Sequence, residues 1–239
     1  MKIQVVSTAQ QCKDFDFNGK TAVVIDVLRA TSVITTALSN GVHSVIPVQT
    51  VEEAERLAAT LPPQSVLKGG ERQAIKISGF DLSNSPLEYQ EKAVKGKDII
   101  LTTTNGTIAI NNAKGAEMIL LACFRNMQAV ADYLITRQND IVIVCAGTEG
   151  AFSLDDGICA GMLVHCIKAK IKTDCDDLAM LLEQAYCNGA HDLFAALANC
   201  HHVQRLFSLG FYDDLRFCLT TNCVNTIPVL KEGKIIPLQ

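Results

Sequence analysis

Short apolar runs alternate with amphipathic segments along most of this chain, and this alternation predicts strands and helices in turn. The apolar runs lack a strict polar and apolar alternation, which is typical of strands buried on both faces of a sheet. The runs predicted to be strands are Thr21 to Ile25, Val42 to Val48, Ser65 to Leu67, Asp98 to Thr102, Met118 to Ala122 and Ile141 to Cys145.

Amphipathic segments separate these runs and predict helices, two of them with clear start signals. Thr50-x-x-Glu53 and Ser85-x-x-Glu88 form capping boxes, the second with Pro86 at the first helical position. The predicted helices are Ala30 to Leu38, Thr50 to Thr60, Ser85 to about Val94, Thr107 to Lys114, Asn126 to Arg137, Leu154 to Lys170, Cys175 to Asn188, His191 to Ala198 and Val203 to Leu209. One or two short strands, at Thr226 to Leu230 and Ile235-Ile236, follow them.

Strands that alternate with helices predict βαβ units, and therefore an α/β fold. Its largely parallel sheet is covered by helices on both faces, in a three-layer α/β/α arrangement. We expect one unit over residues 1–239, or two packed α/β lobes with a boundary near 110–125. In such folds ligands bind where the carboxyl ends of strands meet helix N-termini, so these junctions are where chemistry is expected.

Composition narrows the classes of protein that remain. Apolar residues make up 49% of the 239 residues and charged residues 19%, which excludes a disordered chain. The net charge is −4 and no basic stripe occurs, so a nucleic-acid partner is not expected. No apolar run approaches the roughly 20 residues of a membrane helix, and no signal peptide is evident, so we expect a cytoplasmic protein. The ten cysteines contain no CxxC pair and are predicted to be mostly small core residues.

Several predicted junctions carry acidic side chains that are candidates for a divalent cation. Asp26 directly follows a buried strand, where an unpaired carboxylate is costly, and Glu71, Asp81 and Asp155 lie in comparable loops. Oxygen donors of this kind favour Mg²⁺. Helix capping is the alternative for Asp26, and it explains one of Asp155 and Asp156 equally well.

Other polar residues at the same junctions are candidates for binding an anion. Arg29 and the amides near Thr31 face a helix start, and Arg72 follows a Gly-Gly pair. The run Thr103, Thr104, Asn105 and Gly106 suits a phosphate nest built from backbone amides. Together with the acids, these groups suggest metal-assisted hydrolysis of a small phosphoester.

Other catalytic motifs are not supported by the sequence. No GxGxxG or GxSxG motif occurs, and the Gly19-Lys20-Thr21 triplet lacks the rest of a Walker A loop. His201 and His202 are adjacent on a predicted helix, where their rings point apart, so a zinc site is not predicted.

Sequence blocks at these junctions resemble those of the 2-phosphosulfolactate phosphatases of coenzyme M biosynthesis. The blocks are V-V-I-D-V-L-R-A-T-S (23 to 32), G-G-E-R (69 to 72), G-F-D-L-S-N-S-P-L-E-Y (79 to 89), T-T-T-N-G-T (102 to 107), and C-A-G with F-S-L-D-D-x-x-C-A-G (145 to 161). The resemblance implies a Mg²⁺-dependent phosphatase that converts 2-phosphosulfolactate to sulfolactate and phosphate. It carries over Asp26, Arg29, Glu71, Arg72, Asp81, Asn105 and Asp155 as site residues. After about Thr173 the match is less distinct, and Cys200-His201-His202 departs from the family's pattern.

Under this interpretation Asp26 and Asp155 are the catalytic residues, and either a water molecule or Asp26 itself attacks the phosphorus. Arg125, which follows a predicted strand, is expected to bind the sulfonate. The expected partner is a small anionic phosphoester, and a homodimer is compatible with the sequence. Three alternatives stay open at this point: a phosphatase of another small phosphoester, a nucleotide-dependent transferase, and a non-catalytic binder of anionic metabolites.

Overall fold

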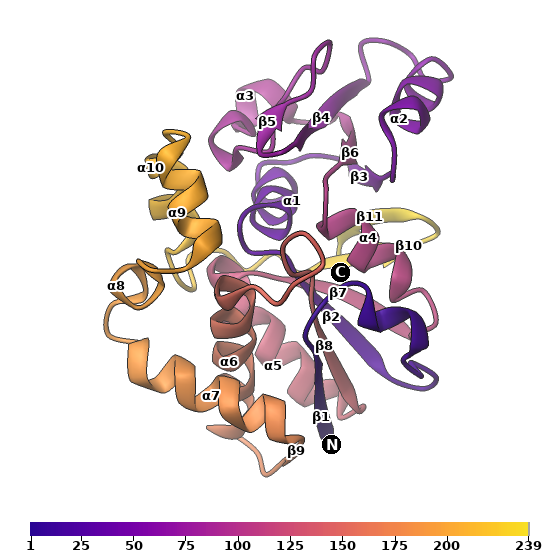
Figure 1. The fold of residues 1–239 in the computed structure, drawn as a ribbon. Coiled ribbons are helices and arrows are strands. Elements are labelled where there is room, and N and C mark those ends of the chain that lie inside the picture. Colours follow the sequence, from indigo (N-terminus) through magenta and orange to yellow (C-terminus); the bar gives the residue numbers. More distant parts are fainter. Residues whose placement is uncertain (239) are drawn as a thin grey trace.

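The computed structural model describes residues 1–238 and contains one sheet of 11 strands (Figure 1). The order of the strands across the sheet is β5-β4-β6-β3-β11-β10-β7-β2-β8-β1-β9. The strands are β1 Lys2–Val6, β2 Thr21–Ile25, β3 Ser44–Pro47, β4 Val66–Arg72, β5 Ile75–Lys76, β6 Asp98–Thr102, β7 Met118–Ala122, β8 Ile141–Cys145, β9 Asp174–Cys175, β10 Pro228–Lys231 and β11 Lys234–Pro237.

Two parallel sets of strands make up this sheet, and a C-terminal hairpin joins them. One set is β7-β2-β8-β1 and the other is β3-β6-β4. The antiparallel hairpin β10–β11 lies between them, with Val229 paired to Leu120 of β7 and Ile235 paired to Val45 of β3. The first set contains strands from both sides of residues 110–125, so a division of the chain into two lobes stays a prediction.

Helices pack on both faces of the sheet (Figure 1). The α-helices are α1 Ala30–Ser39, α2 Val51–Ala58, α3 Glu91–Val94, α4 Gly106–Asn112, α5 Met127–Arg137, α6 Leu154–Lys168, α7 Asp177–Gly189, α8 Leu193–Leu197, α9 His201–Ser208 and α10 Tyr212–Cys218. Short 3-10 helices lie at η1 Gln11–Asp14, η2 Pro86–Glu88 and η3 Phe124–Asn126.

The central strand β2 shows why the sheet needs two covering layers. All five of its residues are buried. Val23 and Ile25 belong to the core that contains α5 and α6, whereas Ala22 and Val24 belong to the core that contains α1 and α4. Successive side chains of a strand point to opposite faces, so an apolar strand of this kind must be covered twice. The predicted three-layer α/β/α fold is confirmed.

Several local predictions were wrong, because contacts between distant segments decide these elements. Strand β1 was not predicted, yet it pairs in parallel with β8, with Ile3 opposite Ile141. Helix α10 was also missed.

The two predicted capping boxes have different outcomes. The Ser85 hydroxyl makes no capping bond, because it donates to Asp214 of α10, and the predicted helix is divided into η2 and α3. By contrast, the Thr50 cap of α2 is confirmed by the bond from the Glu53 amide, 3.1 Å long.

The cysteines take part in packing, as the sequence predicts. All ten are free thiols, and most of them are buried: Cys12, Cys123, Cys145, Cys159, Cys200 and Cys218. Burial raises the pKa of the Cys12 thiol to about 11, and the pKa of the Cys145 thiol is raised well above its ordinary value by burial and by neighbouring carboxylates. The buried thiols are therefore protonated, unreactive core side chains.

Gly161 allows the close packing of α6 against α7, which supports the wall behind the functional site. A β-carbon at this position would lie 2.0 Å from the carbonyl oxygen of Leu182. We therefore expect Gly161→Ala to lower the free energy of unfolding by about 2 kcal/mol, although alanine is the better helix former. Urea unfolding followed by circular dichroism measures the change. A stability equal to or above that of the unchanged chain would contradict this packing.

Candidate functional site

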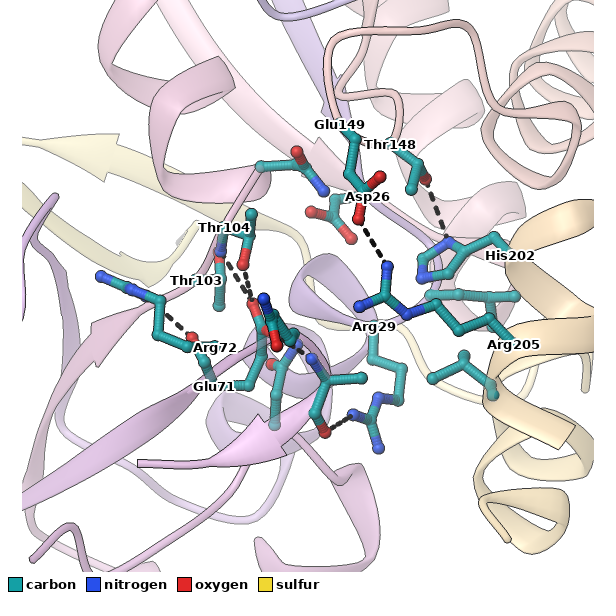
Figure 2. Close-up of a pocket in the computed structure, with 16 residues that line it drawn as sticks. Asp26, Arg29, Glu71, Arg72, Thr103, Thr104, Thr148, Glu149, His202 and Arg205 are labelled. Carbon is teal, nitrogen blue, oxygen red and sulfur yellow. Dashed lines mark hydrogen bonds and ion pairs between the residues drawn. The ribbon is translucent and has the colours of Figure 1, made fainter. Parts of the chain in front are cut away.

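A cavity of about 270 Å³ lies at the carboxyl ends of the central strands. Its walls combine the loop after β2, the end of β4, the loop after β6 and the loop after β8 with helix α9 (Figure 2). The charged residues that line it are Asp26, Arg29, Glu71, Arg72, Glu149, His202 and Arg205. The cavity is therefore small and polar, and it lies where ligands bind in open α/β sheets.

Asp26 stands at the end of β2, with its carboxylate in the cavity and only 7% of the residue exposed. Its Oδ1 accepts a hydrogen bond from the Ala30 amide of α1, 3.2 Å away. Gly106 lies against the other oxygen, because a β-carbon there would come within 2.7 Å of Oδ2. Burial raises the pKa of Asp26 to about 6; the charges of Asp155 and Glu71 add to this rise, while His202 and the Ala30 amide oppose it.

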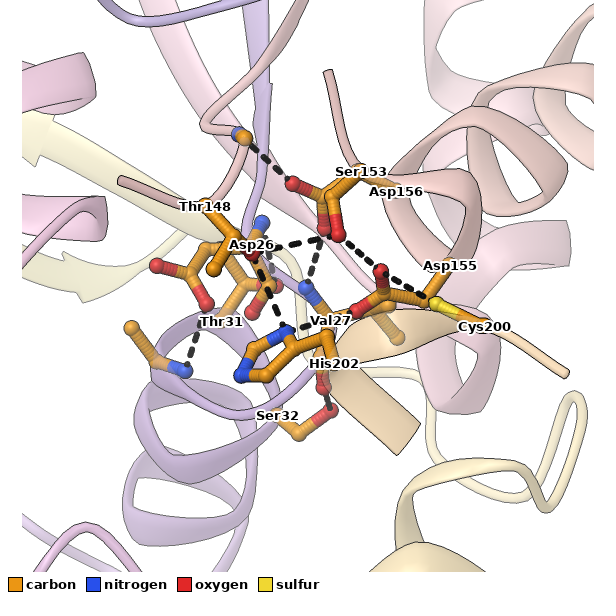
Figure 3. A network of polar contacts seen from close by, with 12 residues as sticks. Asp26, Val27, Thr31, Ser32, Thr148, Ser153, Asp155, Asp156, Cys200 and His202 are labelled. Atoms are coloured by element: carbon orange, nitrogen blue, oxygen red, sulfur yellow. Dashed lines mark hydrogen bonds and ion pairs between the residues drawn. The ribbon is translucent and has the colours of Figure 1, made fainter. Parts of the chain in front are cut away.

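His202, on α9, forms an ion pair with Asp155 of α6 beside Asp26 (Figure 3). The Nδ1 atom of His202 lies 3.2 Å from Asp155 Oδ2. Asp155 also accepts hydrogen bonds from Ser153 Oγ and from the Cys200 thiol, the latter over 3.5 Å. This arrangement orients the imidazole ring and leaves Nε2 with no hydrogen-bond partner among the described residues.

The two partners of this pair shift each other's pKa. Burial opposes the ionisation of Asp155, but the hydrogen bond and charge of His202 outweigh it and lower the pKa of that carboxyl. Burial likewise opposes the protonation of His202, yet the hydrogen bond and charge of Asp155 raise its pKa above the ordinary 6.5. The pair is thus a carboxylate that stabilises a protonated imidazole, an arrangement suited to donating a proton.

Asp156 has a structural role next to this pair. Its two oxygens accept the backbone amides of Val27 and Gly147, each over 2.9 Å, and so join the loops after β2 and β8. Burial, together with the charges of Asp155 and Asp26, raises the pKa of Asp156 well above its ordinary value.

Arg29 lines the cavity, and contacts outside the cavity hold its guanidinium in place. Its Nη1 donates to Asp214 of α10 over 2.5 Å and its Nη2 donates to the Ala74 carbonyl over 3.0 Å, while Phe211 stacks 4.1 Å from the guanidinium. Asp214 in turn accepts a bond from Ser85. Arg29 therefore contributes positive charge to the site and also anchors α10 to the sheet.

The loop after β6 lines the cavity with Thr103, Thr104 and Asn105, as the nest prediction requires. However, the amide and hydroxyl of Thr104 both donate hydrogen bonds to Glu71 Oε1 over 2.8 Å. The Glu71 carboxylate therefore occupies the two donors that the nest prediction assigned to a phosphate. The other oxygen of Glu71 accepts the Ala74 amide over 2.7 Å. The Arg72 side chain points away from the cavity centre and donates to the Glu71 and Gln49 carbonyls and to Thr102 (Figure 2).

Five predicted site residues do not line the cavity, and one of them is Asp155, which is bonded to His202. Thr31 is fully buried and exchanges bonds with the Asp26 backbone, so it supports Asp26 rather than meeting a ligand. Gly106 lies behind Asp26. Asp81 is exposed on the surface, where its Oδ2 accepts the Lys68 amide. Arg125 lies elsewhere: it donates to the Phe217 carbonyl over 2.8 Å and stacks on the Phe217 ring.

Among residues 1–238, no three His, Cys, Asp or Glu side chains are arranged to hold a metal ion together. Both oxygens of Asp155 already accept hydrogen bonds, one from Ser153 and the other from His202. Asp155 is therefore not available to bind a cation together with Asp26. Asn84 offers an oxygen ligand for a metal ion, because it lines the cavity and its buried Oδ1 has no hydrogen-bond partner within the described part of the chain. Mg²⁺ needs few protein ligands and retains waters, so Asp26 and Asn84 fit such an ion.

Four residues of this site were missed in the sequence: Asn84, Glu149, His202 and Arg205. His202 was set aside because its neighbour His201 points elsewhere, an argument that excludes a shared metal but not a single functional histidine. Its spacing of three residues from Arg205 places both on one helix face and is the signal that was available. Asp214, which orders the site through Arg29, lies in a helix that was not predicted.

The fold and this site define an α/β protein with a polar pocket at the carboxyl edge of its sheet, equipped for acid–base chemistry on a small anion. The family model for 2-phosphosulpholactate phosphatase matches residues 6–233, and the chain belongs to this family. Within the described residues, no helix has the length and apolar character needed to cross a membrane.

Similar proteins match over nearly their full length. A protein of Caldanaerobacter subterraneus is 46% identical over 233 residues, which cover 98% of this chain and 97% of its own length. A protein of Clostridium acetobutylicum is 43% identical, covering 99% of this chain and 100% of its own length. One of Clostridium perfringens is 44% identical, covering 98% and 96%. Each of the three is named as a probable 2-phosphosulfolactate phosphatase.

Proposed function

We propose that this chain hydrolyses the phosphoester of 2-phosphosulfolactate to sulfolactate and phosphate, with Mg²⁺ as cofactor. The names of its relatives support this substrate. We also infer that the protein acts in the cytoplasm and that the reaction is a step of coenzyme M biosynthesis. The observation that carries the proposal is the position of Asp26 in one small cavity with the His202 imidazole, which Asp155 holds from behind. A homodimer remains a prediction from the sequence.

The residues around the cavity suit a phosphoryl group at Asp26. Asp26 and Asn84 would hold Mg²⁺, which when bound supplies positive charge to neutralise the phosphoryl oxygens. Arg29 contributes a fixed positive charge, and Thr103 and Asn105 also line the cavity. Because Asp214 and Phe211 hold the Arg29 guanidinium, little reorganisation is needed when the anion binds.

His202 would supply the proton for the leaving group. Phosphoryl transfer passes through a loose transition state, in which negative charge develops on the departing oxygen. The alkoxide of a 2-hydroxy acid is a poor leaving group, so proton donation to this oxygen contributes more than removal of a proton from the attacking water. Asp155 accepts the Nδ1 proton of His202, and this leaves Nε2 to donate.

Phosphate release without a nucleotide tests the proposed function. We expect turnover of 2-phosphosulfolactate in the presence of Mg²⁺ and a loss of at least about tenfold when EDTA removes the ion, with recovery on adding Mg²⁺ back. Malachite-green detection of phosphate measures the rate. Turnover that requires ATP would instead indicate a transferase. Absence of turnover across a panel of small phosphoesters would indicate a binding protein.

A further inference from the structure

An ion pair between Arg205 and Glu149 spans the mouth of the cavity and has no part in the chemistry described above. Arg205 Nη1 of α9 lies 2.6 Å from Glu149 Oε1, in the loop after β8 (Figure 2). Both residues line the cavity. Their side chains are 36% and 69% exposed, in contrast to Asp26 and Arg29 deeper in the site.

Arg205 differs from the other two arginines of the cavity in what holds it. Arg29 is fixed by the buried Asp214, and Arg72 is directed outward by two carbonyls and a hydroxyl. The partner of Arg205 is an exposed carboxylate on a loop, and such pairs exchange readily with water and with other anions. Arg205 is thus the arginine of this cavity that can turn to a ligand without leaving a buried charge unpaired.

The loop that carries Glu149 is a tight turn. Thr148 and Ala151 exchange backbone hydrogen bonds of 2.9 and 3.0 Å, and Glu149 and Gly150 between them have φ values of +53° and +83°. The turn therefore places the Glu149 carboxylate over Arg205 at the cavity mouth. A guanidinium accepts a carboxylate or a sulfonate through the same fork of N–H donors.

We propose that Arg205 binds the sulfonate of the substrate and that Glu149 occupies this position until the substrate displaces it. This assignment rests on the proposed function. With the phosphoryl group at Asp26, the sulfonate sulfur stands one bond farther from phosphorus than the carboxylate carbon does. The sulfonate therefore reaches farther from Asp26 than the carboxylate does, which fits Arg205, a cavity residue more exposed than Arg29. Arg205 takes the role that the sequence had assigned to Arg125.

Steady-state kinetics of Arg205→Gln with three substrates test the subsite. The comparison uses 2-phosphosulfolactate, 2-phospholactate, which lacks the sulfonate, and 2-sulfoethyl phosphate, which lacks the carboxylate. For the two sulfonated substrates we expect KM to rise at least about tenfold with kcat changed less than about twofold, while KM for 2-phospholactate stays within about twofold. Glu149→Gln should lower KM for the sulfonated substrates, because it removes the competing charge.

A matched control is Arg137→Gln, since Arg137 also has 36% of its side chain exposed and pairs with an exposed glutamate, Glu117. It should leave all three KM values unchanged. An equal rise of KM for all substrates in Arg205→Gln, or a rise that follows the carboxylate, would overturn the assignment.

Calorimetric binding of sulfolactate to the unchanged protein and to Arg205→Gln separates the subsite from the reaction. Binding that weakens at least about tenfold in the variant supports the subsite even if no phosphoester is hydrolysed, in which case only the proposed function fails. Equal binding to both proteins would overturn the subsite even if turnover is observed.

Discussion

Replacing Asp26 by asparagine is expected to lower kcat for phosphate release by about a thousandfold or more, because it removes the negative charge that would hold the proposed Mg²⁺ beside the phosphoryl group. The amide has the same shape, and its oxygen can still accept the bond from the Ala30 amide. Initial rates at saturating substrate and Mg²⁺ measure the effect. A variant that retains more than about a tenth of the rate would exclude Asp26 from the reaction.

The same substitution should stabilise the fold, which separates a lost function from a lost structure. The folded chain keeps the Asp26 proton up to about pH 6, whereas the ordinary pKa is 3.8. Ionising this carboxyl therefore costs stability as the pH rises from about 4 to 6, and the cost, up to about 3 kcal/mol, persists above that range. In metal-free buffer at pH 7.5, Asp26→Asn should unfold at a higher urea concentration than the unchanged protein; a lower midpoint would contradict this account.

One experiment also decides how the phosphorus is attacked. If Asp26 attacked the phosphorus directly, an aspartyl phosphate would form, and acid quenching during turnover would trap the phosphoryl group on Asp26. Attack by water forms no such intermediate. We expect mass analysis of the quenched protein to find no phosphorylated Asp26, because both Asp26 oxygens are engaged, one by the Ala30 amide and the other by the cation we propose.

Replacing His202 by glutamine should lower kcat for 2-phosphosulfolactate by about a hundredfold, with little change in KM, because the leaving oxygen then departs without a proton. The effect should depend on the leaving group. An aryl phosphate, whose phenolate needs no proton, should lose less than about threefold. A similar loss for both leaving groups would mean that His202 only shapes the site.

The pH profile gives an independent test of His202. Because the Asp155 hydrogen bond and charge outweigh the effect of burial and raise the pKa of His202 above 6.5, the protonated form persists to higher pH than in a free imidazole. Activity should fall as the pH rises through this raised pKa, and His202→Gln should abolish the fall. Asp155→Asn should shift the decline to lower pH. His201→Gln is the matched control, since His201 is exposed next to it, and it should leave the profile unchanged.

The sequence predicted the layers of this fold because they follow from local periodicity, as in β2, whose apolar residues require cover on both faces. It also pointed to Asp26, Arg29, Glu71 and the Thr103 loop as neighbours, because the ends of parallel strands meet at one edge. It could not show that Asp155 lies behind His202, since that contact joins residues 47 positions apart. Arg125 and Asp81 also follow strands, but tertiary contacts direct them elsewhere.

The position of the C-terminal hairpin has a consequence for how the chain is made. Strands β10 and β11 are synthesised after every other strand of the described sheet, yet they lie in its middle, between β3 and β7. Until they emerge from the ribosome, both of those strands present open edges in a nascent chain whose other parallel strands can already pair. A translation stop shortly before residue 228 would leave the edges of β3 and β7 without their hydrogen-bonding partners. We expect such a truncated chain to aggregate rather than to fold into a shortened enzyme.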